Sequence, residues 1–317
     1  MKIAFLCLAH NNFEYLKVLK DYCVSDGDSF FLHVDNKVDY EDENFKSSDC
    51  YCISDSERLR TRWGTFSIVD ATLKLMALAN STGTYDYYFL ISGHDLPLKS
   101  KFELKNSLKH HRALMSLWSS CEYNRPDSAY LYKNNDITEK INSKRIYREF
   151  FHYTNYEHRL LNIGELQNER SKTKLRFALL FKKILNSFRV KSSFNFDKYY
   201  KGSQWWVLNK EMLNYCLSFK DKKQFFYMHA PDEKYFHTIL MNSIYSREII
   251  ISNGERYLEG SHYIRWKKEG MEKISKKNLT IATNSNAFFT RKIDFEDFDY
   301  FVKHIESLIK DKARNEF

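Results

Sequence analysis

Two hydrophobic patterns alternate along the first hundred residues. Short, almost wholly apolar runs that end on polar residues are typical of buried β-strands leading into loops, and they occur in KIAFLCLAH (2–10), SFFLHVD (29–35) and YDYYFLISGHD (85–95). Between them, NFEYLKVLKDY (12–22) and IVDATLKLMALAN (68–80) carry apolar residues at helical spacing. Strands alternating with helices predict an α/β fold with a mostly parallel, Rossmann-like sheet flanked by helices.

Polar residues stand where these strands end. His10, Asp35 and Asp95 each follow an apolar run. Because parallel sheets bind ligands at the carboxyl ends of their strands, we expect these three residues near a ligand. His33 lies within its strand, so we expect a core histidine there.

Composition narrows the class of protein. The chain has 317 residues, of which 43% are hydrophobic, as in globular proteins. It contains no apolar run of the roughly 18 to 20 residues that a membrane span needs, and its first residues do not resemble a signal peptide. The six cysteines are scattered without a CxxC pair, which favours reduced thiols. We therefore expect a cytoplasmic protein.

The net charge of +9 favours polyanions, phosphorylated substrates or an anionic membrane surface as partners. Residues 169–193 are strongly basic, with apolar residues at helical spacing, although the positive charge is not confined to this segment. This segment is either a helix packed on the domain or an amphipathic helix on a membrane. No helix-turn-helix, zinc-finger or RNP pattern accompanies the charge, so we expect no nucleic-acid partner.

Six short motifs occur in order along the chain. They are FLHVDNK (31–37), RWGTFSIVDATLKLM (62–76), FLISGHDLPLKS (89–100), YKGSQWWVLNKEML (200–213), PDEKYFHTIL (231–240) and SNAFFTRKIDF (285–295). Together they resemble the core-2/I-branching β-1,6-N-acetylglucosaminyltransferases and peptide O-xylosyltransferases, glycosyltransferase family 14, in a compact bacterial-type form. The resemblance implies one GT-A domain over 1–317, with a nucleotide-binding half (about 1–110), an acceptor half (about 111–295) and a helical tail (296–317).

The resemblance also implies an inverting transfer from a UDP-sugar to a glycan hydroxyl, without a cofactor or catalytic metal. In this family the glutamate of the Pro-Asp-Glu motif is the base, which here is Glu233. Pro231 suits the first turn of a helix, so Asp232 and Glu233 would lie near a helix N-terminus, which favours their ionised form. A metal at His229, Glu233 and His237 is the alternative, but Pro231 disfavours a regular helix through 229.

Cationic side chains must then stabilise the departing diphosphate. The resemblance assigns this role to Lys292, with Arg291 beside it. His262 stands where the family has an arginine, so Arg265, Arg256 or a protonated His262 would replace that arginine.

The remaining assignments follow from the same resemblance. The nucleotide would contact Ala9, His10, Asn11, Asp35, Trp63 and Gly64. The sugar or acceptor would contact Asp95, Gln204, Trp205 and Asp232. We expect one tryptophan of the pair Trp205 and Trp206 to be buried.

We expect UDP-GlcNAc as donor, followed by UDP-xylose, UDP-galactose and UDP-glucuronate. The acceptor would belong to surface polysaccharide or lipid-linked glycan synthesis, near the inner face of a membrane. A nucleic-acid-binding protein and an inactive sugar-binding relative are the competing hypotheses.

Overall fold

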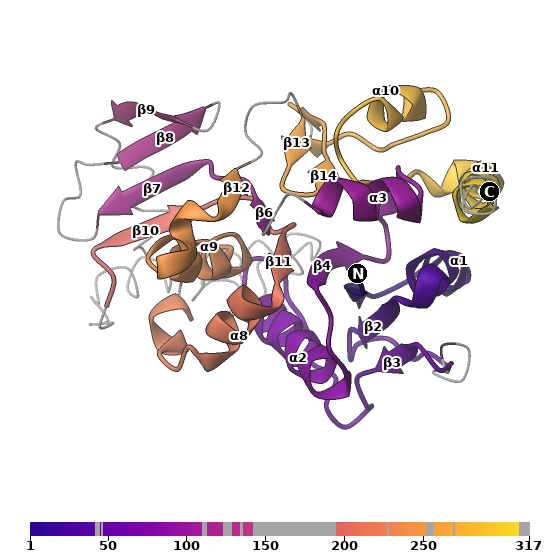
Figure 1. Ribbon diagram of the computed structural model, residues 1–317, viewed down its shortest axis with the longest axis horizontal. Coiled ribbons are helices and arrows are strands. Elements are labelled where there is room, and N and C mark those ends of the chain that lie inside the picture. Colours follow the sequence, from indigo (N-terminus) through magenta and orange to yellow (C-terminus); the bar gives the residue numbers. More distant parts are fainter. Residues whose placement is uncertain are drawn as a thin grey trace, which may run out of the picture.

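The computed structural model describes residues 1–41, 45, 47–109, 113–122, 195–226, 228–251, 257–268 and 270–310, and the backbone alone of 129–133 and 136–141. In the described part the largest sheet has seven strands in the order β12-β6-β11-β4-β1-β2-β3 (Figure 1). Their bounds are β1 Ile3–Ala9, β2 Ser29–Val34, β3 Cys50–Cys52, β4 Tyr87–Ser92, β6 Ala113–Met115, β11 Val207–Asn209 and β12 Ile249–Ile251.

The sheet is mostly parallel, as the sequence predicts. Strands β4, β1, β2 and β3 run parallel, and so do β6 and β12. Strand β11 is antiparallel to both of its neighbours, β4 and β6. The chain is thus a mixed α/β protein whose parallel strands end at one edge of the sheet.

Helices cover both faces of this sheet. On β1, Phe5 and Cys7 join the core beneath α1 (Phe13–Val24) and α11 (Phe298–Lys310), whereas Ala4 and Leu6 join the core beneath α2 (Ser67–Thr82). Helices α8 (Lys210–Ser218) and α9 (Tyr235–Met241) extend this second layer. Because neighbouring side chains of a strand point to opposite faces, a strand buried on both sides must be apolar throughout.

The polar stretch before β2 is structural. Residues Ser25–Gly27 form the short 3-10 helix η1 at the amino end of β2, opposite the strand end expected to bind ligands. Asp28 is fully buried and lies 2.7 Å from Lys101 Nζ, and its other oxygen accepts the Ile3 amide at 2.8 Å. Lys101 begins α3 (Lys101–Leu108). This stretch therefore lies away from the carboxyl ends of the strands.

Smaller sheets bring distant segments beside the main one. One contains β13 (Leu258–Glu259), β14 (His262–Tyr263), β17 (Phe289–Thr290) and β5 (Leu96–Pro97), in that order. A second joins β10 (Lys198–Lys201), β7 (Ser119–Glu122), β8 (Ala129–Lys133) and β9 (Asp136–Ile141), and a third is β15 (Trp266–Lys267) with β16 (Gly270–Met271). The remaining short helices are η3 Lys222–Phe225, η4 Pro231–Glu233, η5 Ile244–Arg247, α10 Leu279–Thr283 and η6 Phe295–Asp297.

Helix α11 packs beside α1 (Figure 1). None of the helices in the described ranges is long and apolar enough to cross a membrane. None of the six cysteines forms a disulfide, in agreement with the reduced thiols that the sequence favours. The basic segment 169–193 and Arg256 lie outside the described residues.

Candidate functional site

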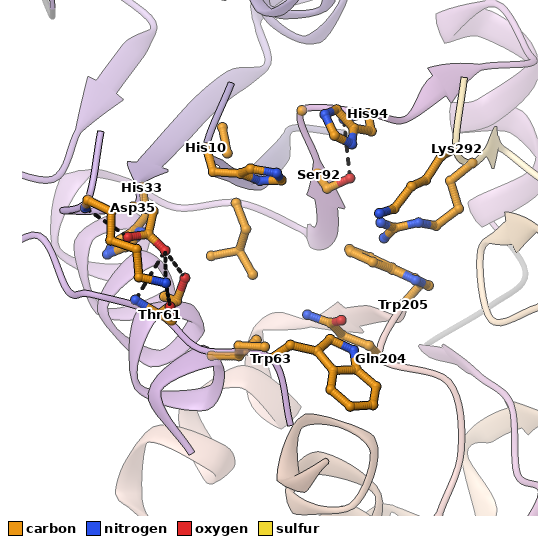
Figure 2. Close-up of a pocket in the computed structure, with 16 residues that line it drawn as sticks. His10, His33, Asp35, Thr61, Trp63, Ser92, His94, Gln204, Trp205 and Lys292 are labelled. Carbon is orange, nitrogen blue, oxygen red and sulfur yellow. Dashed lines mark hydrogen bonds and ion pairs between the residues drawn. The ribbon is translucent and has the colours of Figure 1, made fainter. Parts of the chain in front are cut away.

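A cavity of about 320 Å³ opens at the carboxyl ends of β1, β2 and β4. Loops that precede β11 and follow β17 complete its wall (Figure 2). Eight of the residues predicted from the sequence line it: Ala9, His10, Asp35, Trp63, Gln204, Trp205, Arg291 and Lys292. The polar ends of separate strands therefore converge, as the parallel topology requires.

Asp35 organises the loop that borders the cavity. Its carboxylate accepts hydrogen bonds from the Lys37 amide at 2.9 Å and from the Thr61 amide at 3.2 Å. It also accepts a hydrogen bond from the Thr61 hydroxyl. Trp63 follows on this loop and is 71% exposed at the cavity's rim (Figure 2). The buried carboxylate thus fixes the loop that presents an open indole ring.

Gly64 supports this rim without lining the cavity. Its φ of 73° lies in the left-handed region, which glycine adopts without strain. Its carbonyl accepts the Ala230 amide at 3.2 Å, and the Trp63 ring stands edge-on to His229 with centroids 5.4 Å apart. The Trp63 loop is therefore joined to the segment that leads into the Pro-Asp-Glu motif.

Two histidines face each other across the ends of β1 and β4. The rings of His10 and His94 lie 5.1 Å apart. Burial, followed by the charges of His10 and Lys292, lowers the pKa of His94 to about 4. Burial and then Lys292 also lower the pKa of His10. Asn11 does not line the cavity, but its Oδ1 lies 2.6 Å from His94 Nε2 and fixes that ring. Both histidines are therefore neutral hydrogen-bonding groups at pH 7.

Arg291 forms a cationic wall of the cavity. Its guanidinium lies 3.9 Å from the centre of the Trp205 ring, and Nε lies 3.7 Å from Asp95 Oδ1. The side chain is buried, yet Nε and Nη1 have no hydrogen-bond partner among the described residues. Buried guanidinium donors are normally hydrogen-bonded, so these two atoms retain unused donor capacity next to the cavity.

Asp95 is the counter-ion behind this wall. It is fully buried, and its carboxylate accepts hydrogen bonds from the Ser92 amide and the Ser92 hydroxyl, both at 2.7 Å. Burial raises its pKa, but Arg291 and His262 outweigh burial and leave the pKa below its usual value. Asp95 does not line the cavity, so this structure does not place it in contact with a sugar, the role expected from the sequence.

His262 is likewise turned away from the cavity. It is fully buried, with Nε2 2.9 Å from Asp95 Oδ2 and Nδ1 2.9 Å from Ser261 Oγ. A carboxylate only accepts, so Nε2 carries the proton and Nδ1 accepts from the serine. Burial lowers the His262 pKa below its usual value. The sequence-based expectation of a protonated His262 on the diphosphate is therefore at odds with this structure.

The other predicted cations divide between two environments. Lys292 follows Arg291 and lines the cavity, and burial and Arg291 lower its pKa. Arg265 does not line the cavity; its Nε lies 3.0 Å from Glu272 Oε2, and its guanidinium covers the Tyr257 ring. In this structure Arg291 and Lys292, and not Arg265, line the cavity.

Glu233 ends the short helix η4, which Pro231 begins. Its Oε2 lies 3.3 Å from Lys201 Nζ, and its carbonyl accepts the Gly202 amide at 2.9 Å. A side chain at Gly202 would overlap the carbonyl oxygen of Ser116, so only glycine permits this close contact. The motif around Gly202 and the Pro-Asp-Glu motif are therefore held side by side, although Glu233 does not itself line the cavity.

Asp232 is buried next to Glu233, and its Oδ1 has no hydrogen-bond partner in the described part of the chain. Burial, and then the charge of Glu233, raise the pKa of Asp232 to about 7. Two adjacent carboxyls thus have different environments, one paired with a lysine and one protected from water.

The histidines near Glu233 do not gather around it. His237 is fully buried in α9, and His229 contacts Trp63. Within the described ranges no group of three histidine, cysteine or acidic side chains is placed to hold a metal ion. The expected burial of one tryptophan is confirmed, since Trp206 is fully buried while Trp205 lines the cavity.

Several residues of this region were missed by the sequence reasoning. The cavity is also lined by Lys37, Ser92, Gly93 and His94, which lie within recognised motifs, and by Thr61, which directly precedes one. Position at a strand end was the available signal. Lys201 had no comparable signal, because its role depends on a contact with a residue distant in the sequence.

The sequence of the chain is similar to one family of known proteins. No curated protein matches this chain. The sequence model of the Core-2/I-Branching enzyme family matches residues 3–292, a range that includes every residue assigned above to the cavity and to the Glu233 region. The chain therefore belongs to the Core-2/I-branching enzyme family, which is a family of glycosyltransferases.

Proposed function

We propose that this protein transfers a sugar, GlcNAc in the first instance, from a UDP-sugar to a hydroxyl of a glycan acceptor, with inversion and without a metal ion. The donor would occupy the cavity at the carboxyl ends of β1, β2 and β4. Family membership supports a sugar donor and an acceptor. The finer claims are based on the side chains around the cavity.

The observation that carries the proposal is the buried guanidinium of Arg291, whose Nε and Nη1 have no hydrogen-bond partner among the described residues. With Lys292 it forms a pair of adjacent cations on the cavity wall. A departing UDP gains negative charge on its diphosphate, and charge-assisted hydrogen bonds to these cations stabilise it. This arrangement supplies the positive charge that a divalent ion provides in other transferases.

The nucleoside would occupy the opposite side of the cavity. Figure 2 places His10 and Asp35 across the cavity from Lys292, with Trp63 at the rim. Asp35 retains acceptor capacity for a ribose hydroxyl or a uracil N–H, since a carboxylate has about four lone-pair directions. The neutral His10 and the open Trp63 ring suit an uncharged, planar base.

Glu233 would act as the general base. The acceptor oxygen attacks the anomeric carbon, the bond from that carbon to the diphosphate oxygen breaks with its electrons passing to UDP, and the acceptor proton passes to Glu233. Lys201, 3.3 Å away, is the counter-ion of the carboxylate. The hydrogen bond from the Gly202 amide to the Glu233 carbonyl keeps the base beside the loop that carries Gln204 and Trp205.

The donor and the base are tested together by UDP release from a panel of UDP-GlcNAc, UDP-xylose, UDP-galactose and UDP-glucuronate, with and without EDTA. We expect one donor to be turned over, with little effect of EDTA. Glu233→Gln should lower the rate by about 10²- to 10⁴-fold while UDP still binds. Glu14→Gln is the control, because Glu14 is 79% exposed and paired only with Lys17 on α1.

Loss of activity in EDTA would contradict the metal-independent mechanism. Binding of UDP without turnover of any donor, across a broad set of glycoside acceptors, would favour an inactive sugar-binding protein.

We further propose a cytoplasmic location at the inner face of a membrane, where lipid-linked glycans are built. The proposal depends on the net charge of +9 and on the basic segment 169–193. Co-sedimentation with vesicles of anionic lipid at low salt tests it, and equal recovery with neutral vesicles would contradict it.

A further inference from the structure

A second cavity, also of about 320 Å³, shares the Trp63 loop with the first. Thr61 and Trp63 line the first cavity. Arg60 and Arg62, which alternate with them along the chain, line the second. The described part of its lining is completed by Thr65, Phe66, Ser67, Asp70 and Phe226. These residues do not line the first cavity, so a ligand of the second cavity contacts different side chains from the donor.

The positive charge of the second cavity comes from two guanidinium groups. Arg60 is exposed and Arg62 is half-buried. Asp70 is the acidic side chain among the described residues of the lining, so two positive charges stand against one negative charge. Guanidinium groups donate pairs of parallel N–H bonds that match the oxygens of a phosphate. The cavity therefore favours an anion.

The backbone beside these cations is fixed at the start of α2. The Arg62 amide donates to Ser67 Oγ at 2.9 Å, and the Arg62 carbonyl accepts the Thr65 hydroxyl at 2.9 Å. The cavity thus opens at the N-terminus of a 16-residue helix, where the aligned peptide dipoles add partial positive charge. Because the turn is already ordered, less entropy is lost when an anion binds there.

The second cavity adjoins the segment that leads to the proposed base. Phe226 lines it, and the Phe226 ring lies 4.7 Å from the ring of Phe66. The loop between the two cavities is also joined to this segment, since the Gly64 carbonyl accepts the amide of Ala230, which directly precedes the Pro-Asp-Glu motif. A glycan that extends from Glu233 towards Phe226 therefore meets the second cavity.

We propose that Arg60 and Arg62 bind a phosphate group carried by the acceptor glycan. The inference rests on the proposed function and names the chemical class of its acceptor. The phosphate is either a substituent of the glycan or the diphosphate that links it to a lipid, because both present the same oxygens. Donor and acceptor phosphates are thereby bound by different cations, Arg291 and Lys292 in the first cavity and the two loop arginines in the second.

The first experiment measures binding while UDP fills the first cavity. Calorimetric titrations in saturating UDP use glucose 1-phosphate, glucose 6-phosphate, N-acetylglucosamine 1-phosphate and, for comparison, methyl β-glucuronide. We expect the wild type to bind at least one sugar phosphate, and Arg60→Gln to raise its Kd about tenfold or more. Arg247→Gln is the matched control, because Arg247 is also exposed but lines neither cavity.

The second experiment measures transfer and identifies the source of the phosphate. N-acetylglucosamine is presented as its p-nitrophenyl glycoside, as its 1-phosphate, and linked through a diphosphate to a short prenyl chain. Arg60→Gln should raise the KM of the phosphate-bearing acceptors about tenfold or more, with a much smaller change in kcat and in the KM of the p-nitrophenyl glycoside. A larger effect on the prenyl diphosphate than on the 1-phosphate assigns the cavity to a lipid-linked diphosphate, and the reverse assigns it to a phosphate substituent.

No binding of any sugar phosphate by the wild type overturns the site. Tighter Arg60-dependent binding of the glucuronide than of every sugar phosphate overturns phosphate as its ligand. Should Arg60→Gln have little effect, Arg60→Glu decides the matter by reversing the charge, since Kd values equal to those of the wild type in both variants overturn the site. Failure of the proposed function has a different signature: the wild type would neither bind UDP nor release it from any donor, whereas binding of sugar phosphates would still depend on Arg60.

Discussion

Asp95 and His262 face each other inside the protein, with His262 Nε2 2.9 Å from Asp95 Oδ2 and both side chains fully buried. They are 167 positions apart in the sequence, and the sheet formed by β5, β17 and β14 brings them together. The His262 ring lies against Trp205 on one side and Phe289 on the other, with centroid separations of 5.0 and 5.5 Å. The pair therefore supports Arg291 and Trp205 from behind, outside the cavity itself.

Asp95→Asn should destabilise the protein by about 3 kcal/mol or more, because it leaves the buried Arg291 without its counter-ion. Urea unfolding at pH 7 measures the loss. Asp55→Asn is the matched control: Asp55 is 80% exposed and pairs with Arg58 at 2.8 Å, so its loss should cost less than about 1 kcal/mol. Similar losses in the two variants would show that Asp95 is not an essential counter-ion.

Lys292→Ala should weaken UDP binding roughly ten- to hundredfold, because it removes one of the adjacent cations on the cavity wall. Calorimetric titration with UDP at low salt provides the measurement. Lys273→Ala is the control, since Lys273 is 65% exposed and pairs with Asp294 outside the cavity. Equal affinities for the two variants would remove Lys292 from the diphosphate site.

Asp232 should make the folded protein less stable as the pH rises. The unfolded chain releases this proton near pH 4, whereas the folded chain holds it until about pH 7. Between these values the folded state binds a proton that the unfolded state has lost, so stability falls with increasing pH. Asp232→Asn cannot titrate, and relative to the wild type it should gain about 1 to 3 kcal/mol between pH 5 and pH 8.

Urea unfolding of both proteins at the two pH values tests this, with Asp55→Asn again as the control for loss of a carboxylate. Parallel changes of stability in the wild type and Asp232→Asn would mean that Asp232 titrates alike in the folded and unfolded states.

Gly202→Ala should destabilise the protein by about 3 kcal/mol or more, because the new methyl group overlaps the Ser116 carbonyl and approaches the His237 ring. Displacement of Gly202 would also break its hydrogen bond to the Glu233 carbonyl. Gly27→Ala carries a backbone cost, because the Gly27 φ is 71°, but its new methyl group meets no atom within 4 Å, so it should cost only about 1 kcal/mol. Thermal unfolding compares them, and equal shifts would contradict the steric explanation.

Much of the fold follows from local pattern. The apolar runs that become β1, β2 and β4 are buried on both faces, and the intervening helical patterns become α1 and α2. Because these strands run parallel, their carboxyl ends lie at one edge of the sheet, which is why His10 and Asp35 could be placed near one cavity. Sequence periodicity suffices here because each element is decided by its own residues.

The direction of individual side chains could not be predicted in this way. Asp95 ends a strand-and-loop motif like Asp35, yet it faces the interior, because Arg291 and His262 reach it from strands remote in the sequence. A sequence motif records that a polar group is present, whereas burial and pairing depend on the packing of several elements.

The sequence by itself determined the alternation of strands and helices, the family to which the chain belongs, and the set of polar residues from which a site is built. Tertiary structure alone decided that Arg291 and Lys292 line the cavity while His262 does not, and that the Gly202 amide binds the Glu233 carbonyl. The physical reason is that the two kinds of feature depend on interactions of different range. Secondary structure depends on neighbours along the chain, but the exposure, charge and orientation of a functional side chain depend on neighbours in space.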